Sequence, residues 1–253
     1  MKDFKEAFEK TRLAGSIAAG ALDEVSKIVK PGISTNEIDK LCYEYINDHQ
    51  AYSAPLFYRG FPKSCCTSAN HVVCHGIPSD KILKEGDIVN VDVTAFKDGW
   101  HGDTSRMFKI GKVSIKAEKL INSTYVAMMK AISIVKDNIH LGDIGSTIQK
   151  YVEAEGFSVV QDFCGHGIGE AFHKEPNILH YGEKGSGEKI KTGMIFTIEP
   201  MINIGKYETK ILNDGWTAVT RDKSLSAQFE HTIGVTNNGC EVFTQSNNTN
   251  LIL

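Results

Sequence analysis

The chain has 253 residues, with 28 basic and 31 acidic side chains and a net charge of −3. This length accommodates one large α/β domain or two small ones, and an apolar content of 41% is ordinary for a globular protein. No run of Lys or Arg exceeds two residues, which argues against nucleic acid as the main ligand. Neither a signal-peptide core nor a run of about 18 apolar residues is present, so we expect a cytoplasmic protein without a membrane span.

The cysteines are scattered along the chain and include no C-x-x-C pair. Two of them are adjacent, which is a poor geometry for a disulfide. In a chain of this size we interpret them as reduced thiols of a cytosolic protein; they stand at positions 42, 65, 66, 74, 164 and 240.

The N-terminal part is predicted to be helical. Apolar residues at helical spacing predict a helix over residues 3–29, ended by Pro31-Gly32. Ser34 and Glu37 form a capping-box pattern that opens a second helix reaching about His49. Residues 50–82 mix Pro, Gly, Ser and aromatics, which predicts loop with short strands.

The remainder alternates between strands and helices. Residues 87–94 alternate like a strand, and Trp100–Phe108 should be the hairpin partner across Asp98-Gly99. Helices are predicted over 114–138 and 143–155, and further strands over 194–199, 216–220 and 228–235. No linker divides the chain, so we expect a single catalytic domain, 1–253.

A weak internal repeat suggests two halves. The segment Lys84–Asp92 lies 107 residues before Lys191–Glu199, and both read Lys-x-Gly-x-Ile-apolar-x-apolar-acid. Helix pairs around Pro31-Gly32 and Leu141-Gly142 match with an offset of 110. We therefore predict duplicated α/β halves, roughly 1–112 and 113–253, with Asp92 and Glu199 facing the cleft between them.

Acidic residues in strand-like segments suggest a metal site. A four-residue loop from Phe96 to Gly99 would place Asp92 directly opposite Asp103, and facing carboxylates repel unless a cation lies between them. An exposed hairpin that carries acids is the alternative for this pair. Glu199 ends an apolar strand and Glu230 stands in another, where a structural ion pair or a water-facing acid is the alternative. Several carboxylates converging on one cleft favour a metal, and with imidazoles they suit Mn, Fe, Co or Zn.

Three histidines are further candidates. His166 is flanked by glycines in Cys164-Gly-His-Gly-Ile-Gly169, which alone would indicate only a loop histidine. His75 and His173 could equally be surface residues. The zinc motif H-E-x-x-H and the nucleophile elbow G-x-S-x-G are absent from the sequence, and Cys74 beside His75 is better explained as a packed thiol than as a nucleophile.

Six linked motifs resemble the type I methionine aminopeptidases in order and spacing. They are Val72–Pro78 (VVCHGIP), Gly86–Val93 (GDIVNVDV), Asp98–Thr104 (DGWHGDT), Gly165–Gly169 (GHGIG), Thr197–Pro200 (TIEP) and Gln228–His231 (QFEH). The resemblance implies an α/β (α+β) pita-bread fold, with two pseudo-symmetric halves, a central curved antiparallel sheet and helices on its outer face. It also implies a bacterial-like short form that removes N-terminal methionine when the second residue is small.

The resemblance assigns roles to individual residues. It implies two divalent metal ions, with Asp92 bidentate on one, Asp103 and Glu230 bridging both, and His166 and Glu199 completing the second. Glu199 would move a proton as a hydroxide between the metals attacks the first peptide bond, assisted by His75 and His173 near the scissile amide. The methionine side chain would occupy a pocket of Tyr58, Phe61, Cys66, Phe172 and Trp216. Asn70, Val72 and Ser226 match positions where some members hold a monovalent cation.

The sequence departs from the family at Pro55, where cysteine is frequent, at Phe61, where tyrosine is frequent, and at His71, which replaces an acid. The expected partners are nascent polypeptide N-termini, with the ribosome as a further candidate, and a monomer is expected. Two alternatives remain: another pita-bread peptidase such as an X-Pro aminopeptidase, and a metal-free pita-bread binding module. All five ligand positions carry coordinating residues, which disfavours the second.

Overall fold

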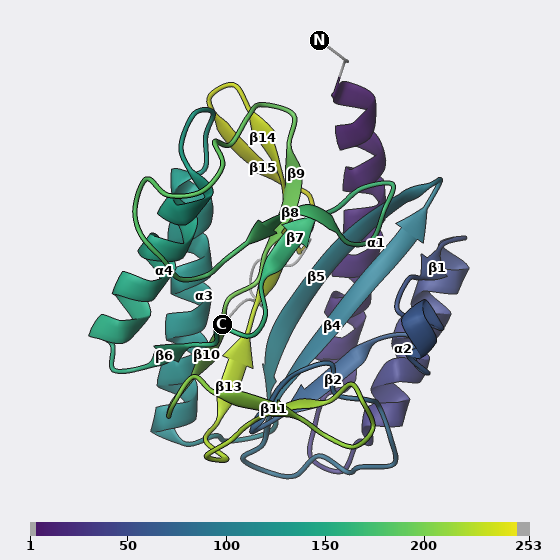
Figure 1. Cartoon of the computed structure of the whole chain (residues 1–253). Helices are drawn as coiled ribbons and strands as arrows, with labels where there is room; N and C mark the ends of the chain where they lie inside the picture. The colour runs from purple at the N-terminus through teal and green to yellow at the C-terminus, as the bar shows by residue number, and fades with distance from the viewer. Residues whose placement is uncertain (1–3, 247–253) are drawn as a thin grey trace.

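The computed structural model describes residues 4–246 as a mixed α/β fold built around one large curved sheet (Figure 1). The described helices are α1 (Lys5–Ile28), α2 (Thr35–Asp48), α3 (Ile115–Ile134) and α4 (Leu141–Ala154), with a 3₁₀ turn at Tyr58–Gly60. None of these helices is long and apolar enough to cross a membrane.

The main sheet has the order β1-β4-β5-β14-β9-β7-β8, with β2 beside β4 and β15 beside β14. All pairings between the described strands of this sheet are antiparallel, as predicted. Its strands are β1 (Tyr52–Ser53), β2 (Cys66–Ala69), β4 (Ile88–Lys97), β5 (Trp100–Lys109), β7 (Gly165–Gly167), β8 (Lys174–Ile178), β9 (Ile195–Ile198), β14 (Glu230–Thr236) and β15 (Gly239–Val242).

Two smaller sheets flank the main one. The first has the order β13-β10-β6 and the second the order β11-β12-β3. Their strands are β3 (Val72–Cys74), β6 (Ser158–Val159), β10 (Met201–Asn203), β11 (Thr209–Ile211), β12 (Ala218–Thr220) and β13 (Ser226–Gln228).

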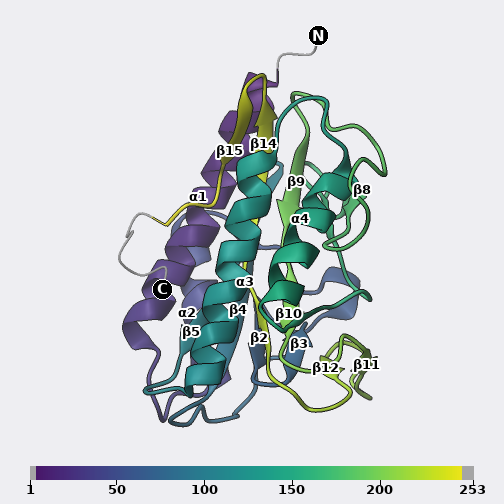
Figure 2. The same ribbon diagram turned by 90° about the vertical axis from the view of Figure 1, so that its left-hand side faces the viewer.

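The helices cover one face of the sheet and form two apolar cores. Val89, Val91 and Val93 of β4 are fully buried against α1 and α2. Phe196 and Ile198 of β9 belong to a second core with α3 and α4. Figure 2 shows α1, α3 and α4 standing along the same side of the strands. Because side chains alternate along a strand, the residues between these apolar positions point to the opposite, concave face.

Most predicted elements are confirmed, including the Ser34–Glu37 capping box. The predicted first residue of α1, at position 3, lies outside the described residues. The third helix ends at Ile134 rather than at 138, because Asn138 is left-handed (φ 69°) and its N–H donates to the Ile190 carbonyl. The predicted strand 228–235 is broken at Phe229, where the chain passes from a small sheet to the main one and the ring packs on Tyr125.

The predicted register of the central hairpin is wrong by two residues. The turn has two residues rather than four, Asp98 and Gly99, both with positive φ (50° and 85°), which is the hallmark of a type I′ turn. Asp92 therefore pairs with Ser105, and Asp103 pairs with Thr94. The two acids still share one face, but as diagonal neighbours instead of direct partners.

The central strands run β4-β5-β14-β9, which is the order that a two-fold duplication would generate. The two apolar cores divide in largely the same way, one with α1 and α2 and the other with α3 and α4, although Ile88 and Met107 of the first half belong to the second core. On these observations we propose that the halves, roughly 1–112 and 113–253, are duplicated units of one domain. The join between them is short, since β5 and β14 pair only through Ser105 with Glu230 and Thr104 with His231.

Candidate metal centre and active-site cavity

One cavity of ≈ 350 Å³ brings together the predicted metal ligands, both predicted catalytic histidines and the predicted methionine pocket. Its lining includes Asp92, Asp103, His166, Glu199, Glu230, His75, His173, Tyr58, Phe61, Cys66, Phe172 and Trp216. These residues are spread from position 58 to position 230 of the chain. The cavity lies on the concave face of the main sheet, where the polar positions of β4 point.

Five different segments deliver the five predicted ligands. Asp92 lies on β4 and Asp103 on β5, both on the face opposite the valines packed under α1. His166 is the middle residue of the short strand β7. Glu199 directly follows β9, and Glu230 begins β14. Period-two alternation along the strands therefore places each of the carboxylates toward the cavity.

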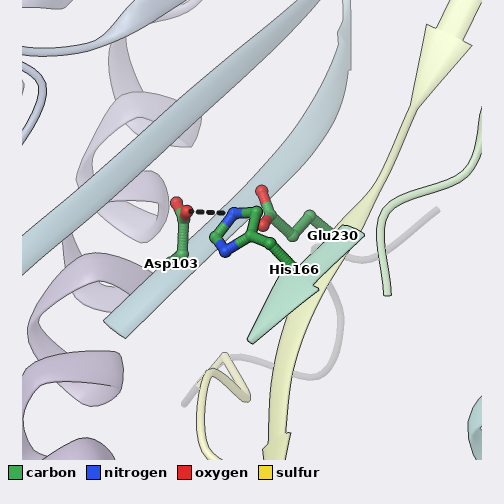
Figure 3. A group of neighbouring side chains, drawn as sticks. All are labelled: Asp103, His166 and Glu230. Atoms are coloured by element: carbon green, nitrogen blue, oxygen red, sulfur yellow. Dashed lines mark ion pairs between the residues drawn. The ribbon is translucent and has the colours of Figure 1, made fainter. Parts of the chain in front are cut away.

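Three of these side chains converge closely. Asp103, His166 and Glu230 each present a ligand atom, and these atoms lie within 4.8 Å of one another (Figure 3). His166 Nε2 is 3.6 Å from Asp103 Oδ2 and also 3.6 Å from Glu199 Oε1. Asp92 lines the same cavity and completes the set.

Neighbouring side chains orient the carboxylates. The Thr94 hydroxyl donates to Asp103 Oδ1 (2.7 Å), and the Thr197 hydroxyl donates to Glu199 Oε1 (2.7 Å). Gln228 Nε2 donates to Glu199 Oε2 (3.3 Å). By contrast, Glu230 Oε1 is buried without a hydrogen-bond partner in the described part of the chain. A buried carboxylate oxygen of this kind is costly unless a cation meets it.

The tautomer of His166 also fits a metal. Its Nδ1 is 3.1 Å from the Gly167 carbonyl oxygen, which can only accept, so Nδ1 carries the proton and Nε2 keeps its lone pair. Burial lowers the pKa of His166 to about 4, so the ring is neutral at pH 7. A lone pair directed at two carboxylates is repulsive without a cation between them, and metal-bound histidines commonly show this hydrogen bond from the other ring nitrogen.

Burial also disfavours charge on the carboxylates. It raises the pKa of Asp92 to about 7 and, with a contribution from Asp92, that of Glu199 to about 8. The pKa values of Asp103 and Glu230 are raised well above their usual range, first by burial and then by the neighbouring carboxylates. Divalent cations would offset this desolvation and repulsion, so the residues present fit a metal centre.

The metal-free protein should lose stability as the pH rises from about 6.5 to 8. A carboxyl whose folded-state pKa is raised stabilises the fold below its unfolded pKa, and this contribution disappears as the pH passes the folded value, about 7 for Asp92 and 8 for Glu199. His166, whose pKa is lowered to about 4, has a smaller effect of opposite sign, because its ring in the unfolded chain is still partly protonated at pH 6.5. Thermal unfolding in a chelator at both pH values measures this.

Glu230→Gln should reduce the loss of stability between pH 6.5 and 8 and raise the Tm of the metal-free protein at pH 8, because the amide is neutral at every pH. Glu188→Gln makes the same chemical change at an exposed position and should leave the slope of Tm against pH unchanged. An equal slope in wild type and Glu230→Gln would contradict the assignment of Glu230 as a buried charged ligand.

The predicted catalytic histidines lie beside the aromatic pocket. His173 Nδ1 is 3.0 Å from the Tyr58 hydroxyl, and its ring centroid is 4.2 Å from that of His166. His75 meets Phe163 and Trp216 edge-on. Partial burial and the neighbouring His166 hold the pKa of His173 below its ordinary value, and burial lowers that of His75. Both rings are therefore neutral hydrogen-bonding groups at pH 7.

The predicted methionine pocket is assembled from two aromatic pairs and a thiol. Phe61 packs edge-on against Trp216 (centroids 5.2 Å apart), and Tyr58 lies 4.9 Å from Phe172. Cys66 on β2 pairs directly with Asp92, so its thiol stands next to the metal ligands. Burial raises the pKa of Cys66 well above its usual range and keeps it a neutral thiol.

Sequence reasoning missed several residues of the site. Thr94, Thr197 and Gln228 were not predicted, although each lies two residues from a ligand along the chain. That period-two spacing is the signal that identifies them. Other unpredicted residues line the cavity, namely Arg59, Asp162, Phe163, Cys164 and Met201, and they come from loops or short strands where no regular spacing exists.

The residues predicted for a monovalent cation lie outside the lining of this cavity. They nevertheless come close together, because the Ser226 N–H donates to the Asn70 carbonyl (2.9 Å) and Val72 follows two residues later. The buried Ser226 hydroxyl has no hydrogen-bond partner in residues 4–246.

The chain is similar to known proteins over nearly its whole length. The chain is 59% identical to the methionine aminopeptidase of Rickettsia prowazekii over 240 residues, which is 94% of this chain and 93% of the relative. It is 56% identical to that of Escherichia coli K12 over 241 residues, 94% of this chain and 91% of the relative. A crystal structure of methionine aminopeptidase from Rickettsia prowazekii superposes with a TM-score of 0.94 at 58% identity, covering 95% of this chain and 98% of that one.

A more distant structure, a prolidase from Pyrococcus furiosus, has a TM-score of 0.76 at 21% identity and shares the fold alone. It covers 96% of this chain but only 65% of the prolidase. The architecture is the pita-bread fold that the sequence motifs implied. The sequence profile of metallopeptidase family M24 matches residues 9–237. The chain thus belongs to metallopeptidase family M24.

Proposed function

We propose that this chain is a methionine aminopeptidase, which removes the N-terminal methionine from nascent proteins and peptides when the second residue is small. The observation that carries the proposal is one cavity in which an aromatic-and-thiol pocket adjoins a cluster of carboxylates and an imidazole. The relatives named methionine aminopeptidase, at 53–59% identity over nearly the whole chain, support it. An unbranched thioether side chain suits such a pocket because sulfur packs favourably against aromatic rings.

The metal would be held by Asp92, Asp103, His166, Glu199 and Glu230, and the family's dinuclear pattern implies two divalent ions. Bound there, such ions supply a Lewis acid and lower the pKa of water toward neutrality. Oxygen and imidazole donors suit Mn, Fe, Co or Zn, and the cell's supply would decide among them. A monovalent cation near Asn70, Val72 and Ser226 is proposed on the unpartnered Ser226 hydroxyl.

Glu199 is proposed to move the proton of the attacking water to the leaving nitrogen. Thr197 and Gln228 hold its two oxygens in place, so the carboxylate is oriented before the reaction begins. His173 is proposed to donate a hydrogen bond to the developing oxyanion, and Tyr58 fixes the orientation of its ring. His75, set against Trp216, is proposed to contact the amide nitrogen near the leaving group.

The physiological partner would be the N-terminus of a nascent polypeptide. Contact with the ribosome and a monomeric state are expected from the resemblance. A cytoplasmic location is proposed because the described cysteines are all free thiols.

A peptide assay distinguishes the proposal from its alternatives. The protein should cleave Met-Ala-Ser, release methionine in a metal-dependent manner and leave Ala-Pro peptides intact, since the pocket is shaped for an unbranched side chain. Liquid chromatography of the products measures this. Preferential cleavage of Ala-Pro peptides would indicate an X-Pro aminopeptidase instead. Tight peptide binding without cleavage at any metal concentration would indicate a binding module.

A further inference from the structure

A second cavity adjoins the active-site cavity and is not used by the proposed chemistry. It measures ≈ 580 Å³ and lies between α2, β1 and the loop that leads to Tyr58. Tyr58 and Phe172 line both cavities, so they form the wall between them. Figure 1 shows α2 and β1 beside β4 at the edge of the main sheet. We call this second cavity the aromatic groove; its lining also includes Tyr43, Asn47, Tyr52, Ser53, Ala54, Leu56, Phe57, Phe96 and His101.

The aromatic groove exposes large apolar side chains to an unusual degree. Phe57 is 77% exposed, Tyr52 is 73% exposed and Tyr43 is 43% exposed. Single exposed aromatics are common on protein surfaces, but several gathered in one hollow indicate a binding surface. None of the lining residues is Asp, Glu, Lys or Arg. The groove therefore favours an uncharged, apolar ligand.

The backbone holds Phe57 outward at a conformational cost. Phe57 and Arg59 both adopt left-handed conformations (φ 65° and 49°), which bulky side chains rarely do. The turn is fixed by hydrogen bonds from the Phe57 N–H to the Phe61 carbonyl (2.8 Å) and from the Gly60 N–H to the Phe57 carbonyl (3.2 Å). Backbone strain of this kind persists where the surrounding structure maintains it, and it clusters at ligand-binding positions. A strained turn that presents a phenyl ring to solvent beside a catalytic cavity is such a position.

The substrate itself is the occupant that the geometry favours. The active-site cavity, at ≈ 350 Å³, is near the lower end of ligand-pocket volumes, so most of a polypeptide must lie outside it. A chain that leaves over Tyr58 and Phe172 passes directly into the aromatic groove. We infer that the groove binds the substrate polypeptide from about its third residue onward and selects uncharged, apolar side chains there. This inference rests on the proposed aminopeptidase function.

Two peptides with the same first three residues test the inference. Met-Ala-Ser extended by Leu-Phe-Gly should have a kcat/KM roughly 5- to 10-fold above that of Met-Ala-Ser extended by Ser-Gly-Gly, through a lower KM, because the apolar side chains become buried in the groove. Phe57→Asn combined with Tyr52→Ser should bring this ratio close to one. Asparagine tolerates the left-handed conformation, so the turn itself is kept.

Two control variants keep the result interpretable. Phe57→Tyr preserves the ring and should preserve the ratio. Ile115→Ser removes an 88% exposed apolar side chain at the start of α3, away from the groove, and should also preserve the ratio. If Met-Ala-Ser is cleaved but both extensions are processed equally, the groove inference is wrong while the proposed function stands.

If Met-Ala-Ser is not cleaved at all, it is the proposed function that fails. A second copy of the chain could also occupy the aromatic groove, and analytical ultracentrifugation tests this by measuring self-association. Self-association that Phe57→Asn abolishes, without any peptide preference, would assign the aromatic groove to a second copy of the chain and overturn the inference.

Discussion

Glu199→Gln should lower kcat by roughly 10²–10⁴-fold while the protein remains folded, the range over which a positioned proton-transfer group contributes. The amide has the size of the carboxyl and its oxygen can still accept the hydrogen bond that Thr197 donates at 2.7 Å. It cannot take up a proton from the attacking water, and it is a poorer metal ligand. Steady-state kinetics with Met-Ala-Ser, with far-UV circular dichroism on the same samples, measures both effects.

Glu188→Gln is the matched control for this experiment, since the side chain is exposed and lies in a loop away from the cavity. It should have wild-type kcat. Near-normal turnover in Glu199→Gln would rule out the proton-transfer role, whereas unfolding would show that the carboxylate is needed for structure. Metal analysis of the variant separates lost proton transfer from lost metal, because only the second lowers the metal content.

Chelation should reduce activity to the level of a protein-free blank, and added divalent metal should restore it. Without the ion, water keeps its ordinary high pKa and is a poor nucleophile. Chelation should also lower the free energy of unfolding, and added metal should raise it again. A metal at about 100 times its Kd would stabilise the folded state by about 2.7 kcal/mol. Offsetting the repulsion among the four proposed carboxylate ligands would be part of that binding energy. Activity assays and thermal unfolding with and without chelator measure the two effects.

A pair of variants in one hairpin sharpens this test. Asp103→Asn removes a buried ligand and should lower both the metal content and the activity. Asp98→Asn makes the same change five residues earlier in the exposed type I′ turn, where asparagine is equally favoured, and should retain both. Full activity in chelator, with no metal detectable by elemental analysis, would contradict the metal-dependent mechanism for the wild-type protein.

The regular elements could be predicted because the sequence repeats the physical pattern of each. Val89, Val91 and Val93 alternate with polar residues. This alternation alone predicts that β4 is a strand and that Asp92 points to the face opposite the valines. Ser34 and Glu37 mark the start of α2 through reciprocal hydrogen bonds that involve neighbouring residues only. Local interactions of this type are readable from the chain itself.

Most of the features that were missed or predicted wrongly depend on distant contacts, but the hairpin register is an exception. Asp98-Gly99 is a strong signal for a two-residue turn, and the longer loop assumed from Phe96 shifted the register. The break at Phe229 arises because the chain changes sheets there, which no local pattern records. Asp162 and Met201 line the cavity only because loops and the small sheet fold beside it. His166 became a candidate ligand through the family motif, and the hydrogen bond of its Nδ1 to the Gly167 carbonyl now gives a physical basis for it.

The short join between β5 and β14 has a consequence for how the molecule assembles. Asp103 comes from one half of the chain and Glu230 from the other, and they converge where only two residue pairs connect these strands. Each proposed half supplies most of one apolar core, although Ile88 and Met107 of the first half pack into the core of the second. Contact between the halves also brings like charges together. An ion bound by ligands from both proposed halves would hold them together. Cellular metal supply would then affect how much newly made chain is stably folded, as well as how fast the folded protein works.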